Sequence, residues 1–364
     1  MNPNPTTTNA TLPLSPYRGR RVLGTFALGL SLVAATGPAG AAEGNPKVDA
    51  SLKSATGFIL SQMKPKGQFG EAHPVTMTAL GILGLAACGH QPTDPSPEGR
   101  AMRKGLDFVL LPENQTKDGY FGKAPGDNGR MYSHGIITLM LAEMAGMGVD
   151  DKQDALIRER LKLGIKLILR AQAMRKDPLN TGGWHYEPDM PSADMSVTCW
   201  QVMALRAAQN AGMDVPKEAI DKAVDYIKRL YKDVPNSNPP AGGFGYSSPG
   251  TTTSTTAEGL LAIQVCGRYE DKETLAAGNH LLREDINQAK HLFYTIYYYA
   301  QGMYQRGGKF AEASRRTVPE ILLPLQKANG SFLGPDEGGG PVYTASMAML
   351  ALAVKNHFLP IYQR

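Results

Sequence analysis

The sequence predicts an all-α fold, a closed α6/α6 toroid in which an outer ring of helices surrounds an inner ring. Three observations favour this fold. Amphipathic segments alternate with segments that carry almost no charge. A short turn of glycines around an aromatic residue joins the two kinds, with its ring at positions 69, 121, 184, 244 and 332. A unit repeated at this spacing indicates a helical array, and helices that are apolar all round must be buried.

Six helix pairs account for the chain from residue 47 onward. In the fourth outer segment, Ile220, Ala223, Val224 and Ile227 follow an i, i+3, i+4, i+7 pattern, so one stripe is buried and the opposite face is charged. A ring is favoured over an open superhelix, which would leave one face of each inner helix in water. The expected pairs, outer helix first, are Lys47 to Met63 with Val75 to Cys88, Gly99 to Leu111 with Tyr132 to Gly148, Ala155 to Met174 with Ser196 to Ala211, Pro216 to Lys232 with Thr255 to Cys266, Lys272 to Leu282 with Ala289 to Gln305, and Phe310 to Gln326 with Thr344 to Val354.

Residues 1–42 are expected to be a secretory signal, which leaves residues 43–364 as one toroid domain. Three arginines precede the apolar run Val22 to Ala35, and Ala39-Gly40-Ala41 supplies small residues of the cleavage type. The run is short for a bilayer span, although an uncleaved membrane anchor is the alternative. The sequence therefore predicts export to the periplasm or the exterior, and the pair Arg20-Arg21 is compatible with the twin-arginine route.

Charge and ligand spacing exclude several classes of function. The formal charge of +5 falls to +2 once the three arginines of the signal are removed, so no nucleic-acid or anionic-membrane surface is expected. No pair of Cys or His residues has the spacing of a metal site, and the glycine-rich stretches lack the Lys and Ser/Thr of a phosphate loop. We expect no metal and no cofactor, and three free cysteines at Cys88, Cys199 and Cys266.

The turns carry a resemblance to a known family. The stretch from Gln326 to Phe332, with Gly330 between them, resembles the Q-x-x-x-G-x-W repeat of squalene–hopene and oxidosqualene cyclases, with Phe in place of Trp. Gln62 to Phe69 looks like a copy one residue longer, and Gln172 to Trp184 like a copy with an insertion. The whole chain after the signal resembles the prenyltransferase/squalene-cyclase repeat superfamily, and most closely its secreted, single-domain bacterial members. The resemblance implies an α/α toroid equivalent to one of the two barrels of the cyclases.

The resemblance also implies a candidate acid. Class II cyclases protonate an alkene with the middle Asp of a D-x-D-D motif, and Ser192-Ala193-Asp194-Met195 aligns with that motif. Asp194 stands at the proton-donor position, while the neighbouring carboxylates that tune such an acid are missing. The alternative is that Asp194 caps the N-terminus of the helix that follows it.

Other candidate residues come from the neighbouring helices. His134 opens the second inner helix and is a candidate catalytic partner of Asp194, the alternative being a satisfied residue at a helix end. Tyr294 and Tyr298 share one face of the fifth inner helix, where aromatic rings would stabilise a cation by roughly 0.5–2 kcal/mol each or simply fill gaps between helices. Trp184 and Tyr186 are further candidates for substrate contact, although packing in the turn and the core is favoured for both.

Two classes of function remain open. One is a terpene-cyclase-like isomerase that acts on a polyprenyl chain with Asp194 as proton donor, and it requires an apolar cavity that opens near this residue. The other is a non-catalytic exported toroid that binds a protein, glycan or lipid partner through its loops. It predicts a ring filled by Tyr and Met side chains, with any binding groups on the rim.

Overall fold

A computed structural model describes residues 45–334 and 339–363, which belong to one compact unit, Gly44–Arg364. The expected signal segment, residues 1–42, lies outside the described residues. In the part of the chain that is described, no helix is long and apolar enough to cross a membrane.

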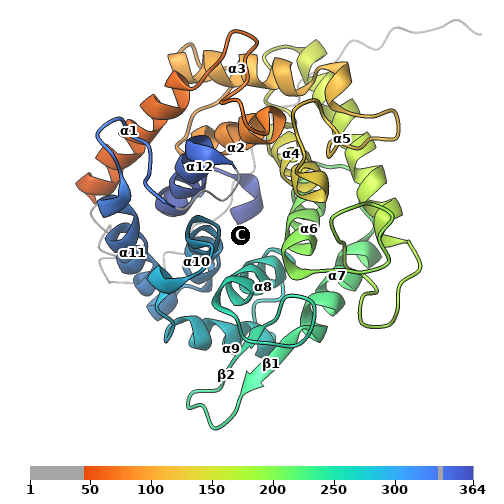
Figure 1. The fold of residues 1–364 in the computed structure, drawn as a ribbon, viewed down its shortest axis with the longest axis vertical. Helices are drawn as coiled ribbons and strands as arrows, with labels where there is room; N and C mark the ends of the chain where they lie inside the picture. Colours follow the sequence, from red (N-terminus) through yellow and green to blue (C-terminus); the bar gives the residue numbers. More distant parts are fainter. Residues whose placement is uncertain (1–44, 335–338, 364) are drawn as a thin grey trace, which may run out of the picture. The chain divides into compact units, whose positions relative to one another are not determined.

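The described residues form twelve α-helices in two concentric rings (Figure 1). The ring closes where α12 packs against α1 and α2, and it confirms the predicted toroid. The inner helices are α2 Pro74–Ala87, α4 Arg130–Met144, α6 Met195–Asn210, α8 Thr253–Val265, α10 Leu292–Arg306 and α12 Gly340–Leu352. The outer helices are α1 Pro46–Ser61, α3 Pro97–Val109, α5 Asp151–Gln172, α7 Lys217–Arg229, α9 Lys272–Leu281 and α11 Gly308–Leu322. Short 3-10 helices follow or link them at Pro112–Asn114, Ile286–Gln288, Leu323–Leu325, Ala353–Asn356 and Pro360–Tyr362.

The two rings differ in burial as the hydrophobic pattern predicts. In α2 every residue from Val75 to Ala87 is buried. In α7 the buried positions, among them Ile220, Val224 and Ile227, form one stripe, and charged side chains cover the rest. Burying a large aliphatic side chain contributes about 1.5–3 kcal/mol, so the inner ring supplies most of the energy that holds the unit together.

Four of the five repeated turns press a glycine against the next outer helix. A Cβ atom on any of these glycines would lie 2.1–2.4 Å from a backbone carbonyl oxygen of that helix. Their φ angles, between +87° and +99°, also favour glycine. Gly330 contacts Ser54 of α1, so the last turn meets the first helix and closes the ring. The glycines and the residues whose carbonyls they meet are Gly67 with Lys104, Gly119 with Leu163, Gly182 with Lys222, and Gly330 with Ser54.

A glutamine ties three of the turns to the ring. The side-chain amides of Gln115, Gln172 and Gln326 each donate to the carbonyl of the turn glycine and to a carbonyl of the next outer helix. Gln115 begins a copy of the repeat, with the regular spacing to Gly119 and Phe121, that sequence reasoning did not single out.

The first turn corrects the expected register of the repeat. Met63 forms a backbone bridge with Phe69 in the way that Gln326 does with Phe332, so Met63 occupies the position of the repeat glutamine. Gln62, which was expected to hold that position, lies one residue earlier, and its amide donates to the hydroxyl of Ser61. The first repeat therefore has the regular length and lacks the glutamine.

The fourth turn also differs from the expectation. The outer helix α7 ends at Arg229 rather than at Lys232, and the next residues form an antiparallel hairpin of β1 Tyr231–Val234 and β2 Ala241–Phe244. The hairpin thus lies between α7 and the inner helix α8, where the expected helix pair left no strand.

The C-terminal segment packs against the inner helices at the end of the ring where these helices terminate. The backbone N–H of Ile361 donates to both carboxylate oxygens of Glu143 on α4, at 3.2 and 3.4 Å. The hydroxyl groups of Tyr297 and Tyr362 form a hydrogen bond between α10 and this segment. Figure 1 places the C-terminus near the axis of the ring. Burial raises the pKa of Glu143 to about 8.

Candidate functional site

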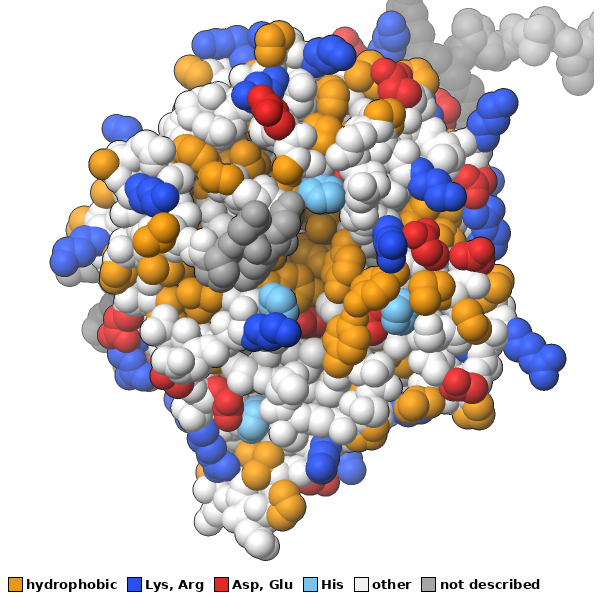
Figure 2. All heavy atoms as spheres, in the orientation of Figure 1, with side chains coloured by type: hydrophobic (Ala, Val, Ile, Leu, Met, Phe, Trp, Pro, Cys, Tyr) orange, Lys and Arg blue, Asp and Glu red, His pale blue; other side chains and the backbone are white. Residues whose placement is uncertain are grey.

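A cavity of about 790 Å³ opens at the end of the ring where the inner helices begin. Figure 2 shows hydrophobic side chains inside the central hollow of this face and histidines around it. All six inner helices contribute side chains from their first turns or from the residues just before them. The lining residues are His73, Thr76, Met77, Leu80, Gly129, Tyr132, Ser133, Ile136, Tyr186, Ser196, Trp200, Tyr246, Thr252, Ser254, Thr255, Glu258, Lys290, His291, Tyr294, Gly339 and Tyr343.

One hydrogen bond per repeat fixes which side chains reach the cavity. In four repeats the N–H of the turn aromatic donates to a side chain on the inner helix, and this aligns the four helices with one another. The accepting residues are Thr78, His134, Thr198 and Thr256. The residues two positions before them, and those two positions after them, all line the cavity. They are Thr76, Tyr132, Ser196 and Ser254 in the first set, and Leu80, Ile136, Trp200 and Glu258 in the second.

Glu258 is an acid at a position that the other three aligned repeats fill with Leu, Ile or Trp. Its side chain is buried, with 2% of the residue exposed, and Oε2 has no hydrogen-bond partner among the described residues. Burial, together with the nearby charge of Asp194, raises the pKa of Glu258 well above its usual value. Sequence reasoning did not select Glu258. Glu258 is the one charged residue of α8. It stands out as unusual only when the repeats are aligned in this register, because the other three carry apolar residues at the same position.

Asp194 lies behind the cavity wall as the N-cap of α6. One carboxylate oxygen accepts the N–H of Val197 at 2.9 Å and the hydroxyl of Ser196 at 3.2 Å. The residue is fully buried, and burial raises its pKa to about 6 although these hydrogen bonds oppose the rise. Ser196 in turn accepts the hydroxyl of Tyr132 at 3.0 Å, and both of these residues line the cavity. Asp194 therefore meets the cavity through Ser196 and Tyr132 and not directly.

His134 is held inside the fold. Its Nδ1 accepts the N–H of Phe121 at 3.3 Å, and its Nε2 lies 3.1 Å from the carbonyl oxygen of Gly164. Burial lowers its pKa to about 4, so the ring is neutral. The histidine beside Asp194 is His185, whose Nε2 is 3.7 Å from Oδ2 of the carboxylate. The structure thus gives His134 the same place as the threonines of the other repeats.

The structure separates the four aromatic candidates into two groups. Tyr186 and Tyr294 line the cavity. Trp184 is the buried ring of its turn, and its Nε1 donates to the carbonyl of Ile168 at 2.8 Å. Tyr298 is fully buried below Tyr294, with ring centres 4.8 Å apart, and does not belong to the lining. Trp200 on α6 also lines the cavity.

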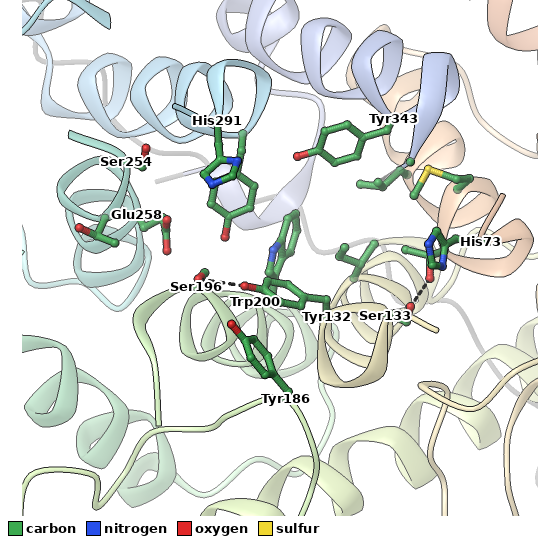
Figure 3. Close-up of a pocket in the computed structure, with 18 of the residues that line it drawn as sticks. His73, Tyr132, Ser133, Tyr186, Ser196, Trp200, Ser254, Glu258, His291 and Tyr343 are labelled. Carbon is green, nitrogen blue, oxygen red and sulfur yellow. Dashed lines mark hydrogen bonds between the residues drawn. The ribbon is translucent and has the colours of Figure 1, made fainter. Parts of the chain in front are cut away.

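The cavity combines apolar side chains with hydroxyls and one acid. Met77, Leu80 and Ile136 come from α2 and α4, which also contribute hydroxyls, and the acid comes from α8. Figure 3 shows one group of side chains, Ser254, Glu258 and His291, across the cavity from another, His73 and Tyr343. In the described part of the chain, no cluster of three His, Cys, Asp or Glu residues could hold a metal ion. The three cysteines are free.

Comparison with known proteins shows the fold. The sequence matches no family model and no curated protein. Among solved structures, an inactive variant of the GH76A α-1,6-mannanase of Salegentibacter in complex with α-1,6-mannotetrose is similar, with a TM-score of 0.60 and 11% identity over 84% of this chain and 98% of that one. The apo structure of the type II terpene cyclase MstE from Scytonema has a TM-score of 0.53 and 15% identity over 86% of this chain and 100% of that one.

A protein from Actinoplanes is similar in the same way, with a TM-score of 0.53 and 14% identity over 85% of this chain and 99% of that one. A glycan hydrolase and a terpene cyclase thus share this architecture. The likeness therefore establishes the α/α toroid, and the chemistry has to be argued from the cavity itself.

Proposed function

We propose that the mouth of the ring binds an amphiphilic small molecule of the isoprenoid or related lipid type, and that the chain belongs with the prenyltransferase/squalene-cyclase repeat proteins. The observation that carries the proposal is the composition of the cavity wall. The aliphatic side chains of Met77, Leu80 and Ile136 share the cavity with a buried acid, Glu258. Ligand cavities are typically apolar with a few placed polar groups, and this composition suits a chain with one polar end.

The raised pKa values of Asp194 and Glu258 limit the chemistry that these acids support. A simple alkene is a very weak base and requires an unusually strong acid, whereas burial raises the pKa of both Asp194 and Glu258. Acids of this kind transfer a proton more readily to an oxygen atom of a polar end. We therefore propose Glu258 as the group that meets the ligand, whereas Asp194 lies behind the cavity wall, bonded to the lining residue Ser196.

The experiment is incubation of the protein, without residues 1–42, with squalene and shorter polyprenyl compounds, followed by mass spectrometry of the products and calorimetry of binding. A rearranged product that disappears in Glu258→Gln supports an isomerase of the terpene-cyclase type. Binding without turnover supports the non-catalytic alternative, a lipid-binding toroid. Neither binding nor turnover with any isoprenoid or lipid refutes the proposal.

A glycan is the second candidate ligand, and a specific observation favours it. A carboxylic acid with a raised pKa is what protonation of a glycosidic oxygen requires, and Glu258 lies in a cavity with Tyr132, Trp200 and other aromatic side chains. The resemblance in fold to the mannanase adds the substrate to test. Release of shorter sugars from α-1,6-mannotetraose by the protein, and its loss in Glu258→Gln, would favour this candidate over the lipid.

We further propose that the protein works outside the cytoplasm, because the sequence of residues 1–42 is of the signal type. Mass spectrometry of the N-terminus of the protein purified from its native cells tests this proposal. A chain that begins near residue 43 supports it, and an intact N-terminus in the cytoplasmic fraction contradicts it.

A further inference from the structure

We propose that the polar end of the ligand is an organic ammonium group, held at Glu258 against the aromatic side chains of the cavity. This inference rests on the proposed function, since it names the head group of the same amphiphile. It stands on three observations: a buried acid without a partner, the charges around it, and the rings beside it.

The surroundings of Glu258 contain acids and hydroxyls but no opposing cation at the same depth. The titratable groups that interact electrostatically with Glu258 lie on α4 and α10 and on or next to α6. They are Tyr132, Asp194, Cys199, Tyr294 and Tyr298. Among the described lining residues, Lys290 and His291 lie exposed at the rim, and His73 lies on the opposite side.

An ammonium group supplies what this arrangement lacks. A buried carboxylate without an opposite charge is costly, so Glu258 keeps its proton while the cavity is empty of cations. A bound cation would pair with the carboxylate after the proton has left. An anionic head group would instead face both Glu258 and Asp194, and an uncharged one would leave the acid as it is.

The aromatic side chains next to Glu258 suit the same head group. Trp200 and Tyr294 line the cavity beside it, and their rings are fixed from behind. Trp200 stacks on Tyr297 with ring centres 5.9 Å apart, and Tyr294 packs against Tyr298 at 4.8 Å. The faces of such rings attract ammonium groups, most strongly where water is excluded. Fixed rings lose little conformational freedom when the cation binds.

The proposal predicts a pH dependence with a definite sign. Because the cation binds to the ionised form, binding releases a proton whenever the pH lies below the pKa of Glu258 in the free protein. The affinity for an ammonium ligand therefore rises with pH, by up to about tenfold per unit, and levels off above that pKa. The affinity for an uncharged ligand of the same chain length stays constant.

The test is isothermal titration calorimetry of the protein without residues 1–42, using three probes with one chain length: hexyltrimethylammonium, 1-hexanol and hexyl phosphate. We expect the ammonium probe to bind at least about tenfold more tightly than the other two at pH 8. Titrations at pH 6 in two buffers of different ionisation enthalpy measure the proton released. We expect a release for the ammonium probe only.

Two variants separate the roles of the buried acids. Glu258→Gln keeps the shape and removes the charge, so the ammonium preference, the pH dependence and the proton release should all disappear. Glu143→Gln is the matched control, because Glu143 is also a buried Glu with a raised pKa but is bonded to Ile361 at the other end of the ring. It should bind all three probes as the wild type does.

The outcomes distinguish this inference from the function on which it rests. If 1-hexanol or hexyl phosphate binds as tightly as the ammonium probe, the head group is wrong while the lipid-binding cavity stands. If no probe and no longer isoprenoid binds, both fail. Should Glu258→Gln not fold, the wild-type titrations decide alone, and ammonium binding without proton release at pH 6 overturns the inference.

Discussion

Replacing Asp194 by Asn should make the protein more stable above pH 6. Asn caps a helix about as well as Asp, so the bond from the N–H of Val197 is kept. What changes is the ionisable group. The pKa of Asp194 is raised from 3.8 to about 6, so the folded protein holds a proton that the unfolded chain releases. Wild-type stability therefore falls as the pH rises from about 3.8 to about 6, and stays lower above that range.

The size of the effect follows from the shift in pKa. A rise from 3.8 to about 6 corresponds to about 3 kcal/mol of stability lost once the carboxyl is ionised. Asp194→Asn should thus unfold at the same urea concentration as the wild type near pH 3.5, and exceed it by up to about 3 kcal/mol at pH 7 and above. Asp194→Ala removes the cap as well, which costs about 1 kcal/mol, so it should lie below Asp194→Asn at every pH.

The assay is urea unfolding followed by circular dichroism between pH 3.5 and pH 8. Asp150→Asn is the matched control, because Asp150 caps α5 through the N–H of Gln153 but is exposed. Removing an exposed charge relieves no burial, so that variant should differ little from the wild type at any pH. A stability difference between Asp194→Asn and the wild type that does not change with pH would refute the reasoning.

Three further predictions concern the ring. The wild type should lose stability between pH 4.5 and about 8 through the raised pKa of Glu143, and Glu143→Gln should lose less over that range when unfolding is measured in urea. Gly119→Ala, where a Cβ would lie 2.3 Å from a carbonyl oxygen, should cost about 2–4 kcal/mol, and Gly267→Ala, with a positive φ but nothing within 4 Å, about 1 kcal/mol. Gln115→Ala should cost about 1–3 kcal/mol because it removes two buried hydrogen bonds, and Gln62→Ala less than about 0.5 kcal/mol; equal losses would contradict the corrected register.

The ring was predictable from the sequence because the forces that build it recur along the chain. The alternation of striped and fully apolar helices determines which ring each helix joins, and α7 and α2 show the two patterns in their plainest form. The register of the turns was harder to predict. Gln62 and Met63 are neighbours, and only the backbone bridge from Met63 to Phe69 shows which of them holds the repeat position.

The candidate site was predicted in part. Tyr186 and Tyr294 were selected and do line the cavity. Trp184 and His134 were also selected, but their polar atoms bond to backbone groups that lie far from them in the sequence. Whether such a side chain is buried depends on the neighbouring helix that it packs against. The pattern of residues within its own helix or turn does not predict this. Glu258 was missed because a single acid in an apolar helix stands out only after the helices are superposed in the correct register.

Asp194 and Glu258 differ in what they do for the fold, and this decides between them. Asp194 is costly to bury, but its carboxylate satisfies the N–H of Val197 at a helix start, so the fold has a use for it. Glu258 has the same cost, and its Oε2 bonds to no group among the described residues. The equivalent position carries Leu80 in the first repeat and Ile136 in the second, where burial stabilises the ring by about 1.5–3 kcal/mol. An acid at this position therefore weakens the ring, and its place in the cavity lining makes Glu258, rather than Asp194, the residue on which a function of this cavity depends.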